Sequence, residues 1–488
     1  KEDRPDEYHE WKMQRRPSLL LRSSNGEIVE KSDEEIQQIE SDGENIVEAL
    51  GCESEESVDV NETPGNYQFD HFFNEFKNKS FKKRSDYITN FLPKYNQVFF
   101  HFTDHNEIVY KSRDGYVVGK PNTNVIRHVV KGKVVKFDDI ASGYTSHIHF
   151  YHDFGFYPDQ KDSHGHDCPP NMLNIWNGFR GQFLEYDMNV IKPILHHIRT
   201  CWANDNELIY NYILNWLAHI VQYPYKKTKV LVILYSSLQQ VGKNIITNFL
   251  IDYVFGQELS YAMAGTDNLT CRFNTNIYQK IFVNCNELST IDGTERNTQF
   301  DLLKNLITED YMDFEIKGGR KWKDDNYMNI LATTNHTFTY KIEDGDARIL
   351  PLKVSNRYAQ NFGYFKRLGE SLNQNTGNHF ISFLKERDLS NVVLTDIPMT
   401  DLKKDMIEHS LPSPIRFLNY VRENNVCFSN WKEVKSKDLF DSFCCWCTEN
   451  NEKKMSNTAF GKIVNTKYEK KRTKGGFVYD LEDMKTGV

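Results

Sequence analysis

A hydrophobic strand that runs into a glycine–lysine loop and then a helix constrains this chain more than any other feature. Residues 230–235 have the continuous apolar pattern of a buried parallel strand. The loop that follows ends in Gly242 and Lys243, and an apolar helical pattern covers 245–254. This order is typical of a phosphate-binding loop, in which backbone N–H groups at a helix N-terminus face phosphate oxygens. We therefore expect an α/β domain with a parallel sheet.

The loop supplies the candidate nucleotide-binding residues, which are Ser237, Gln239, Gln240, Val241, Gly242, Lys243 and Asn244. Lys243 would bring a positive charge to the β- and γ-phosphate oxygens. The pattern GxxxxGK[S/T] is matched only in part, because Ser237 takes the first glycine position and Asn244 replaces the hydroxyl residue that touches magnesium. Asn244 still offers an oxygen, so we expect it to be a Mg²⁺ ligand together with Glu287.

Two later hydrophobic strands end in polar residues suited to nucleotide hydrolysis. Residues 280–287 end in Glu287, a carboxylate that can hold Mg²⁺ or orient the attacking water. Residues 328–335 end in Asn335, an amide that can position water against the γ-phosphate. A polar loop then ends in Arg348, which can reach a neighbouring subunit's nucleotide as an arginine finger. The predicted catalytic set is Lys243, Glu287, Asn335 and Arg348.

A basic hairpin is predicted between these two strands. Gly318 and Gly319 lie between alternating flanks, a pattern that favours a β-hairpin. Basic side chains suit phosphates, and an aromatic ring can stack on a base. The DNA-binding residues predicted here are Lys317, Arg320, Lys321, Trp322 and Lys323.

Residues 411–488 predict a small C-terminal domain that follows Pro412 and Pro414. Three amphipathic helical patterns precede a hairpin with a Gly-Gly tip, an order that indicates a winged helix. Residues 453–474 contain eight Lys or Arg residues against the single acid Glu469, which is an electrostatic footprint for nucleic acid. The predicted DNA-binding residues here are Lys470, Lys471, Arg472 and Lys474.

The order of these motifs resembles that of superfamily 3 helicases, the AAA+-like hexameric motors of viruses, phages and plasmids. The resemblance covers roughly 155–370 and is strongest to the helicase part of poxvirus- and phage-type primase-helicases. It implies an AAA+-like P-loop ATPase core that binds ATP and Mg²⁺ between the subunits of a homo-hexamer. It also places Lys317, Arg320 and Lys321 in the DNA-contacting hairpin and Arg348 at the arginine finger.

The resemblance implies an ATP-dependent replicative DNA helicase that translocates on single-stranded DNA as a ring. Its expected partners are single-stranded or forked DNA, other replication proteins, and a primase that is either separate or upstream in the same polypeptide. Two alternatives stay open. Asn244, Ser237 and Asn286 also fit a non-hydrolysing, nucleotide-dependent DNA-binding ring or loader. An origin-binding protein would act through the C-terminal domain.

Charge and periodicity divide the chain into six segments. Residues 1–62 hold 7 Lys or Arg against 19 Asp or Glu, which predicts a disordered acidic arm. The rest of the chain is mildly basic. The remaining segments are an N-terminal α+β region (63–185), a helical segment (186–225), the ATPase domain (226–365), a helical connector (366–410) and the winged-helix-like domain (411–488).

The cysteines and the apolar runs predict where the chain works. Nine scattered cysteines favour a reducing compartment. No apolar run is long enough to predict a membrane span. We expect an intracellular protein without a membrane partner, in the host cytoplasm or at a viral replication site.

Overall fold

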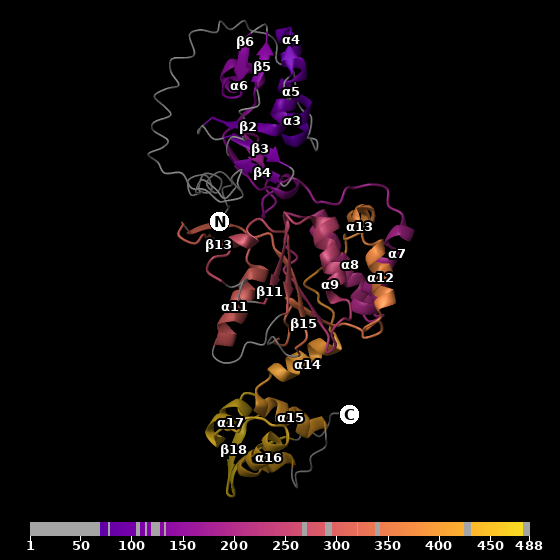
Figure 1. The fold of residues 1–488 in the computed structure, drawn as a ribbon. Coiled ribbons are helices and arrows are strands. Elements are labelled where there is room, and N and C mark those ends of the chain that lie inside the picture. The colour runs from indigo at the N-terminus through magenta and orange to yellow at the C-terminus, as the bar shows by residue number, and fades with distance from the viewer. Residues whose placement is uncertain are drawn as a thin grey trace.

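The structure is a computed structural model. It describes residues 69–76, 79–103, 108–112, 115–118, 127–130, 133–265, 271–287, 295–319, 321–336, 342–423 and 431–481. The predicted acidic arm over 1–62 and the predicted DNA-binding residue Arg320 lie outside these residues. Figure 1 shows N-terminal elements, a central sheet with helices on its two faces, and a C-terminal lobe.

The N-terminal part combines short helices with two small sheets. Its helices are α3 (Phe69–Phe76), α4 (Arg84–Asn90), α5 (Leu92–Val98) and α6 (Asp138–Gly143). One sheet has the order β4-β3-β2-β7 and comprises β2 (Phe99–Phe102), β3 (Ile108–Ser112), β4 (Gly115–Val118) and β7 (Phe150–Tyr151). The other has the order β1-β5-β6 and comprises β1 (Ser80–Phe81), β5 (Arg127–Val130) and β6 (Lys133–Lys136).

Alternating side chains of strand β2 pack into both the N-terminal core and the core of the central domain. Along β2, Phe99 packs into an aromatic core with α3 and α5, whereas Phe100 and Phe102 pack into the central core. Successive strand residues point to opposite faces, so one sheet covers two cores. The N-terminal sheet is therefore held to the central domain by apolar contacts.

Two strands and two helices lead into the central domain. They are β8 (Asp153–Gly155), β9 (Met172–Asn174), α7 (Met188–His197) and α8 (Glu207–Gln222). A π-helical turn over Ile198–Trp202 extends α7. The side chain of Asp187 accepts a hydrogen bond from Asn189 N at the start of α7, and Asn206 accepts one from Ile209 N at the start of α8. Both helices lie within 186–225, the segment for which helices are predicted.

The central sheet contains five parallel strands in the order β11-β12-β15-β10-β16. They are β10 (Leu231–Tyr235), β11 (Ser260–Ala264), β12 (Phe282–Asn286), β15 (Asn329–Thr334) and β16 (Ile349–Lys353). The strands predicted from the apolar runs are thus confirmed. Val232 and Leu234 face one core, and Leu231 and Ile233 face the other, so β10 is buried on both sides.

Helices cover both faces of this sheet (Figure 1). On the face of α7 and α8 lie α9 (Lys243–Phe249), continued by a π-helical turn over Leu250–Phe255, and α13 (Gln374–Glu386). On the other face lie α11 (Glu295–Thr308) and α14 (Asp401–Ser410). The described part of this domain also contains α12 (Phe362–Ser371), which begins at the N-cap Asn361.

The predicted basic hairpin is also confirmed. It consists of the antiparallel pair β13 (Tyr311–Glu315) and β14 (Lys321–Asp325), which connects α11 to β15. Phe314 lies opposite Trp322 in this ladder, and both rings pack into the core on the α11 face.

The C-terminal lobe has its own core. Its helices are α15 (Ser413–Glu423), α16 (Ser436–Glu449) and α17 (Asn457–Val464). Its antiparallel sheet has the order β17-β19-β18, with β17 (Val434–Lys435), β18 (Lys470–Thr473) and β19 (Gly476–Tyr479). Phe443, Phe460 and Tyr479 are fully buried at the centre of this lobe. The predicted helices and terminal hairpin are therefore present, in the predicted order.

Two searches of the described residues were negative. No helix among them is both long enough and apolar enough to cross a bilayer. Nor does any group of three His, Cys, Asp or Glu residues in the described ranges have an arrangement that could hold a metal ion.

Candidate functional site

Three of the four predicted catalytic residues come from neighbouring strands of the central sheet. The loop that carries Lys243 follows β10, Asn335 follows β15, and Glu287 follows β12. Because β12, β15 and β10 are adjacent and parallel, their carboxyl ends meet at one edge of the sheet. Ligands of open parallel sheets bind outside this edge. The candidate site is therefore the carboxyl edge around Lys243.

Lys243 is tied directly to the end of β15. Its Nζ donates hydrogen bonds to Ser236 Oγ (3.1 Å), to the Thr334 carbonyl (2.9 Å) and to Asn335 Oδ1. Burial lowers the pKa of this amine to about 8, and the carboxylate of Glu287 acts in the opposite direction. The loop lysine therefore contacts the polar end of β15 directly.

Glu287 lies at the turn that ends β12. Its backbone is left-handed, with φ of 56°, and its side chain is exposed. The Glu287 N–H points toward Thr333 Oγ1 at 3.5 Å, which holds the turn against β15. The carboxylate is therefore free of the core and faces the edge where Lys243 lies.

The two predicted magnesium ligands carry side-chain oxygens, which are the ligand atoms that a hard cation prefers. Asn244 and Glu287 are both exposed, and each offers an oxygen at the carboxyl edge of the sheet. Asn286 is tied inward instead, because its Oδ1 accepts a hydrogen bond from the buried Asn284 Nδ2 (3.2 Å). Asn284 Nδ2 also donates to Thr247 Oγ1 (3.2 Å) on α9. This chain of polar groups fixes the end of β12 against the helix that begins at Lys243.

The loop itself is fixed at several points. Val241 is 1% exposed and anchors the loop in the central core, so its side chain is not available to a ligand. The prediction for Val241 concerns its backbone as part of the phosphate-binding loop, so it stays a prediction. Ser236 Oγ donates to the Leu238 carbonyl (2.5 Å), and the Gln240 carbonyl accepts from Gln360 N (3.2 Å). Ser237, Gln239 and Gln240 have exposed side chains.

Gly242 is required by both conformation and space. Its φ is +88°, a region that side chains with a Cβ rarely adopt. A Cβ at this position would lie 2.6 Å from Phe365 Cε1 and 2.7 Å from His197 Cε1. The close approach of these two rings to the loop backbone therefore depends on the glycine.

His197 at the end of α7 is a site residue that no motif in the sequence marks. It is fully buried, with Nε2 3.1 Å from the Gly242 carbonyl oxygen and Nδ1 2.9 Å from the Tyr364 hydroxyl. A carbonyl only accepts, so Nε2 carries the proton and Nδ1 accepts from the Tyr364 O–H. Burial lowers the His197 pKa to about 4, so the ring is neutral at pH 7. His197 thus holds the loop carbonyl with a single tautomer.

Aromatic residues around the start of α12 complete this support. The rings of Tyr358 and Tyr364 stack with centroids 3.8 Å apart, and His196 Nε2 lies 3.0 Å from the Tyr358 hydroxyl. Asn361 accepts a hydrogen bond from Tyr364 N (3.0 Å), which sets the start of α12. The segment therefore places Tyr364 against His197 and Phe365 against Gly242.

Arg348 is not brought to this edge. It precedes β16, and its carbonyl accepts from Leu231 N (2.8 Å) at the beginning of β10. The side chain is 44% exposed and lies 4.0 Å from Asp346. Arg348 therefore lies at the amino edge of the sheet, opposite the carboxyl edge that carries Lys243 of its own chain.

The hairpin residues have different surroundings. Lys321 pairs with Asp313 (2.9 Å), and Lys323 Nζ lies 5.1 Å from the centroid of the Tyr311 ring. Trp322 is 7% exposed and packs against Phe314 and Tyr278. Successive residues of β14 point to opposite faces of the hairpin, and Trp322 points toward the core. The prediction that Trp322 stacks on a base is therefore wrong for this conformation. Lys317 remains near the turn, where the chain leaves β13.

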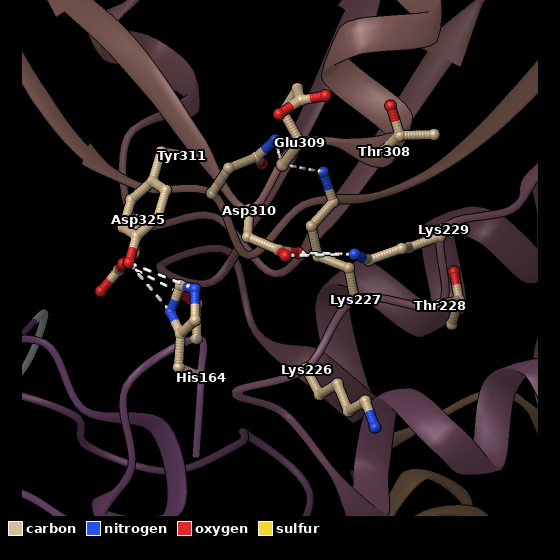
Figure 2. A network of polar contacts seen from close by, with 12 residues as sticks. His164, Lys226, Lys227, Thr228, Lys229, Thr308, Glu309, Asp310, Tyr311 and Asp325 are labelled. Carbon is tan, nitrogen blue, oxygen red and sulfur yellow. Dashed lines mark hydrogen bonds and ion pairs between the residues drawn. The ribbon is translucent and has the colours of Figure 1, made fainter. Parts of the chain in front are cut away.

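A polar network fixes the base of the hairpin to the amino edge of the sheet (Figure 2). The buried Lys227 Nζ donates to the carbonyls of Leu306 (2.6 Å) and Glu309 (2.9 Å) at the end of α11. Lys229 Nζ lies 3.1 Å from Asp310 Oδ1, and Figure 2 shows the two side chains beside each other. Burial lowers the pKa of Lys227 to about 7. Lys227 thereby caps α11 just before the chain enters β13.

The predicted DNA-binding residues of the C-terminal lobe lie on its terminal hairpin. Lys471, Arg472 and Lys474 have exposed side chains, and Lys470 is partly exposed. Lys471 lies 4.0 Å from Asp480, so one of these charges has a weak partner. The structure thus presents the cluster to solvent, as a nucleic-acid contact requires.

Comparison with known proteins adds a family and a phage relative. A protein family of unknown function (DUF5906) matches residues 234–348, the stretch that contains all four predicted catalytic residues. The DNA primase-polymerase of Nitratiruptor phage NrS-1 is 26% identical over 196 residues, which is 40% of this chain and 26% of that protein. The similarity therefore spans about a quarter of the phage protein's length.

The fold is similar to that of solved structures. Two apo structures of the NrS-1 C-terminal region have a TM-score of 0.56, at 16% and 17% identity. Each comparison covers 78% of this chain and 95% of the solved one. At this level of identity the likeness shows a shared fold, and it extends well beyond the matched family segment.

Proposed function

We propose that this chain is a phage-type DNA replication protein whose central domain is an ATP-driven, superfamily 3-like helicase motor. The observation that carries the proposal is the meeting of Lys243, Asn335 and Glu287 at adjacent carboxyl ends of parallel strands. The strand order, in which the loop strand β10 lies between β15 and β16, supports a P-loop ATPase of the AAA+ type. The similarity to a phage primase-polymerase supports a role in replication.

The residues have distinct roles in this proposal. Lys243 exchanges its contacts with Thr334 and Asn335 for the β- and γ-phosphates of ATP, and the loop N–H groups contact the same oxygens. Mg²⁺, held by Asn244 and Glu287, would neutralise phosphate charge. Glu287 orients the attacking water, and Asn335, released by Lys243, contacts the γ-phosphate.

The rest of the motor is assembled from neighbouring subunits. Arg348 lies at the edge opposite its own Lys243, so it would complete the site of the next subunit in a homo-hexameric ring. The hairpin of Lys317, Lys321 and Lys323, with Arg320, would contact single-stranded DNA in the ring. The C-terminal lobe, whose helix and strand order supports a winged helix, would bind forked DNA. A primase and other replication proteins would act with it inside the host cell.

The first experiment is ATP hydrolysis by the chain, with and without single-stranded DNA. Lys243→Ala and Glu287→Gln are compared with Lys226→Ala, which changes an exposed lysine beyond the other end of the same strand. We expect the wild-type chain to hydrolyse ATP faster when single-stranded DNA is present. In the first two variants kcat should fall by at least about 100-fold, which is the usual effect of removing one catalytic group. The control should keep its activity.

The outcomes separate the alternatives. Nucleotide binding without turnover in the wild-type chain would favour the non-hydrolysing ring or loader, for which Ser237, Asn244 and Asn286 are the supporting residues. Neither binding nor turnover, together with unchanged DNA binding by Lys243→Ala, would overturn the motor and favour an origin-binding protein.

A further inference from the structure

The terminal hairpin presents an exposed aromatic ring among cations. Phe477 on β19 is 51% exposed, although its strand neighbours Val478 and Tyr479 are buried. Its cross-strand partner is Arg472, whose guanidinium carbon lies 6.0 Å from the ring centroid. Lys470 Nζ lies 4.8 Å from the same centroid. A large apolar surface is thus held in solvent within reach of two positive charges.

The hairpin holds this ring in a fixed place. Thr473 Oγ1 donates to the Gly476 carbonyl (3.1 Å), which closes the turn. Gly476 has a φ of +119°, a conformation that other residues rarely adopt. Two residues along the same face of β19, Tyr479 is 0% exposed and belongs to the core of the lobe. The strand therefore projects Phe477 from a rigid base, and binding a flat ligand to it would cost little ordering entropy.

The chemistry of this surface favours one ligand. Lysine and arginine side chains contact phosphates, and a phenyl ring stacks on the face of a nucleobase. In a duplex the base faces are covered by neighbouring pairs, so only an unpaired or terminal base offers one. A basic protein surface would be repelled by Lys470, Arg472 and the exposed Lys474.

We propose that Phe477 is a stacking site for an unpaired nucleobase, with Lys470, Arg472 and Lys474 contacting the phosphates beside it. The proposal deepens the proposed function, because it assigns the C-terminal lobe to the unpaired strand at a fork rather than to the duplex. It does not depend on ATP hydrolysis.

The experiment measures binding of the full chain, without nucleotide, to a labelled dT oligonucleotide and to a blunt duplex of equal length. Phe477→Ala, Phe477→Tyr and Lys474→Ala are compared with the wild-type chain. A second probe carries 2-aminopurine, whose fluorescence falls when the base stacks. All variants are checked for an unchanged unfolding midpoint, which is expected because Phe477 and Lys474 are exposed.

We expect Phe477→Ala to weaken dT binding by roughly 5- to 100-fold, the range for loss of one stacked base, and to abolish 2-aminopurine quenching. Phe477→Tyr should retain both. The salt dependence of binding should stay constant in Phe477→Ala and become shallower in Lys474→Ala, because only the latter removes a phosphate contact.

The contrary results are distinct. If Phe477→Ala binds dT as the wild-type chain does while Lys474→Ala is weaker, the lobe binds nucleic acid through charge alone and the stacking site is wrong. If Phe477→Ala lost affinity for the duplex and for dT to the same extent, the stacking site would also be wrong. If the wild-type chain binds neither probe, the proposed DNA function fails as well.

Discussion

The charge on Lys243 depends on its burial, and this makes nucleotide affinity depend on pH. In the free chain the Lys243 pKa is lowered to about 8, so the amine is mostly charged at pH 7. A bound phosphate favours the charged form, so above pH 8 binding must take up a proton. We therefore expect the dissociation constant for ATP to rise about tenfold per pH unit above 8. Titration of a fluorescent ATP analogue from pH 7 to 9.5 measures this slope.

Lys243→Arg is the control for this prediction. Its guanidinium stays charged throughout the range, so any remaining pH dependence in that variant belongs to other groups. If the affinity of the wild-type chain for ATP does not change between pH 7 and 9.5, Lys243 keeps its proton over this range. Its pKa would then not be lowered, and its amine would be more exposed to solvent than in the structure.

His197 and Tyr364 provide the second prediction at the residue scale. Tyr364→Phe removes the hydroxyl that selects the His197 tautomer, so Nε2 no longer has to carry the proton toward the Gly242 carbonyl. Loss of one such hydrogen bond corresponds to about a 3- to 10-fold weaker affinity for nucleotide. We expect this change in KM for ATP with a smaller change in kcat, because the loop and not the reacting water is affected.

Two further variants test whether the hydrogen bond or the ring matters. Glutamine can donate to the Gly242 carbonyl, so His197→Gln should bind nucleotide more tightly than His197→Ala. Tyr358→Phe serves as the matched control, since Tyr358 contacts His196 and not His197. Equal KM values for His197→Gln, His197→Ala and the wild-type chain would contradict a positioning role.

At the scale of elements, the hairpin β13–β14 combines a buried face with a basic face. Trp322 packs on Phe314 and Tyr278 in the core, so Trp322→Ala should lower the free energy of unfolding by about 3–5 kcal/mol. Among the described residues, Trp322 Nε1 has no hydrogen-bond partner, so Trp322→Phe loses volume but no polar contact with them. Urea unfolding and DNA binding of both variants measure the two effects separately.

DNA binding decides between a core and a contact role for this ring. We expect Trp322→Phe to bind single-stranded DNA as the wild-type chain does, while Lys317→Ala binds more weakly. If Trp322→Phe weakened DNA binding and left the unfolding midpoint unchanged, the ring would have to leave the core on binding.

At the scale of the whole molecule, Arg348 and Lys243 lie at opposite edges of one sheet, so under the proposed function they act together only between chains. We expect Lys243→Ala and Arg348→Ala each to abolish ATP turnover. Mixing the two inactive variants should restore part of it, because some interfaces then pair an intact Lys243 with an intact Arg348. Turnover and oligomeric state measured on the same mixture check this. Full activity of Arg348→Ala alone would contradict the arrangement.

Local sequence was sufficient for the elements and for the carboxyl-edge residues. The apolar runs that end at Tyr235, Asn286 and Thr334 are strands, and the residues that follow them had to meet once these strands were parallel neighbours. The strands of the two glycine-containing hairpins follow from apolar residues that alternate every second position. The C-terminal helices follow from apolar residues spaced three to four positions apart. These features depend on neighbours in sequence, which is why they are visible without the fold.

Contacts between distant residues were decided only by the tertiary structure. Alternation along β14 shows that Trp322 and Lys321 point in opposite directions, but the core on the α11 face determines which one is buried. His197 reaches Gly242 because α7 packs beside the start of α9, and no spacing in the sequence encodes that contact. Arg348 is separated from Lys243 by the direction of β16. In each case the sequence sets the chemistry of a side chain, and packing sets what that side chain meets.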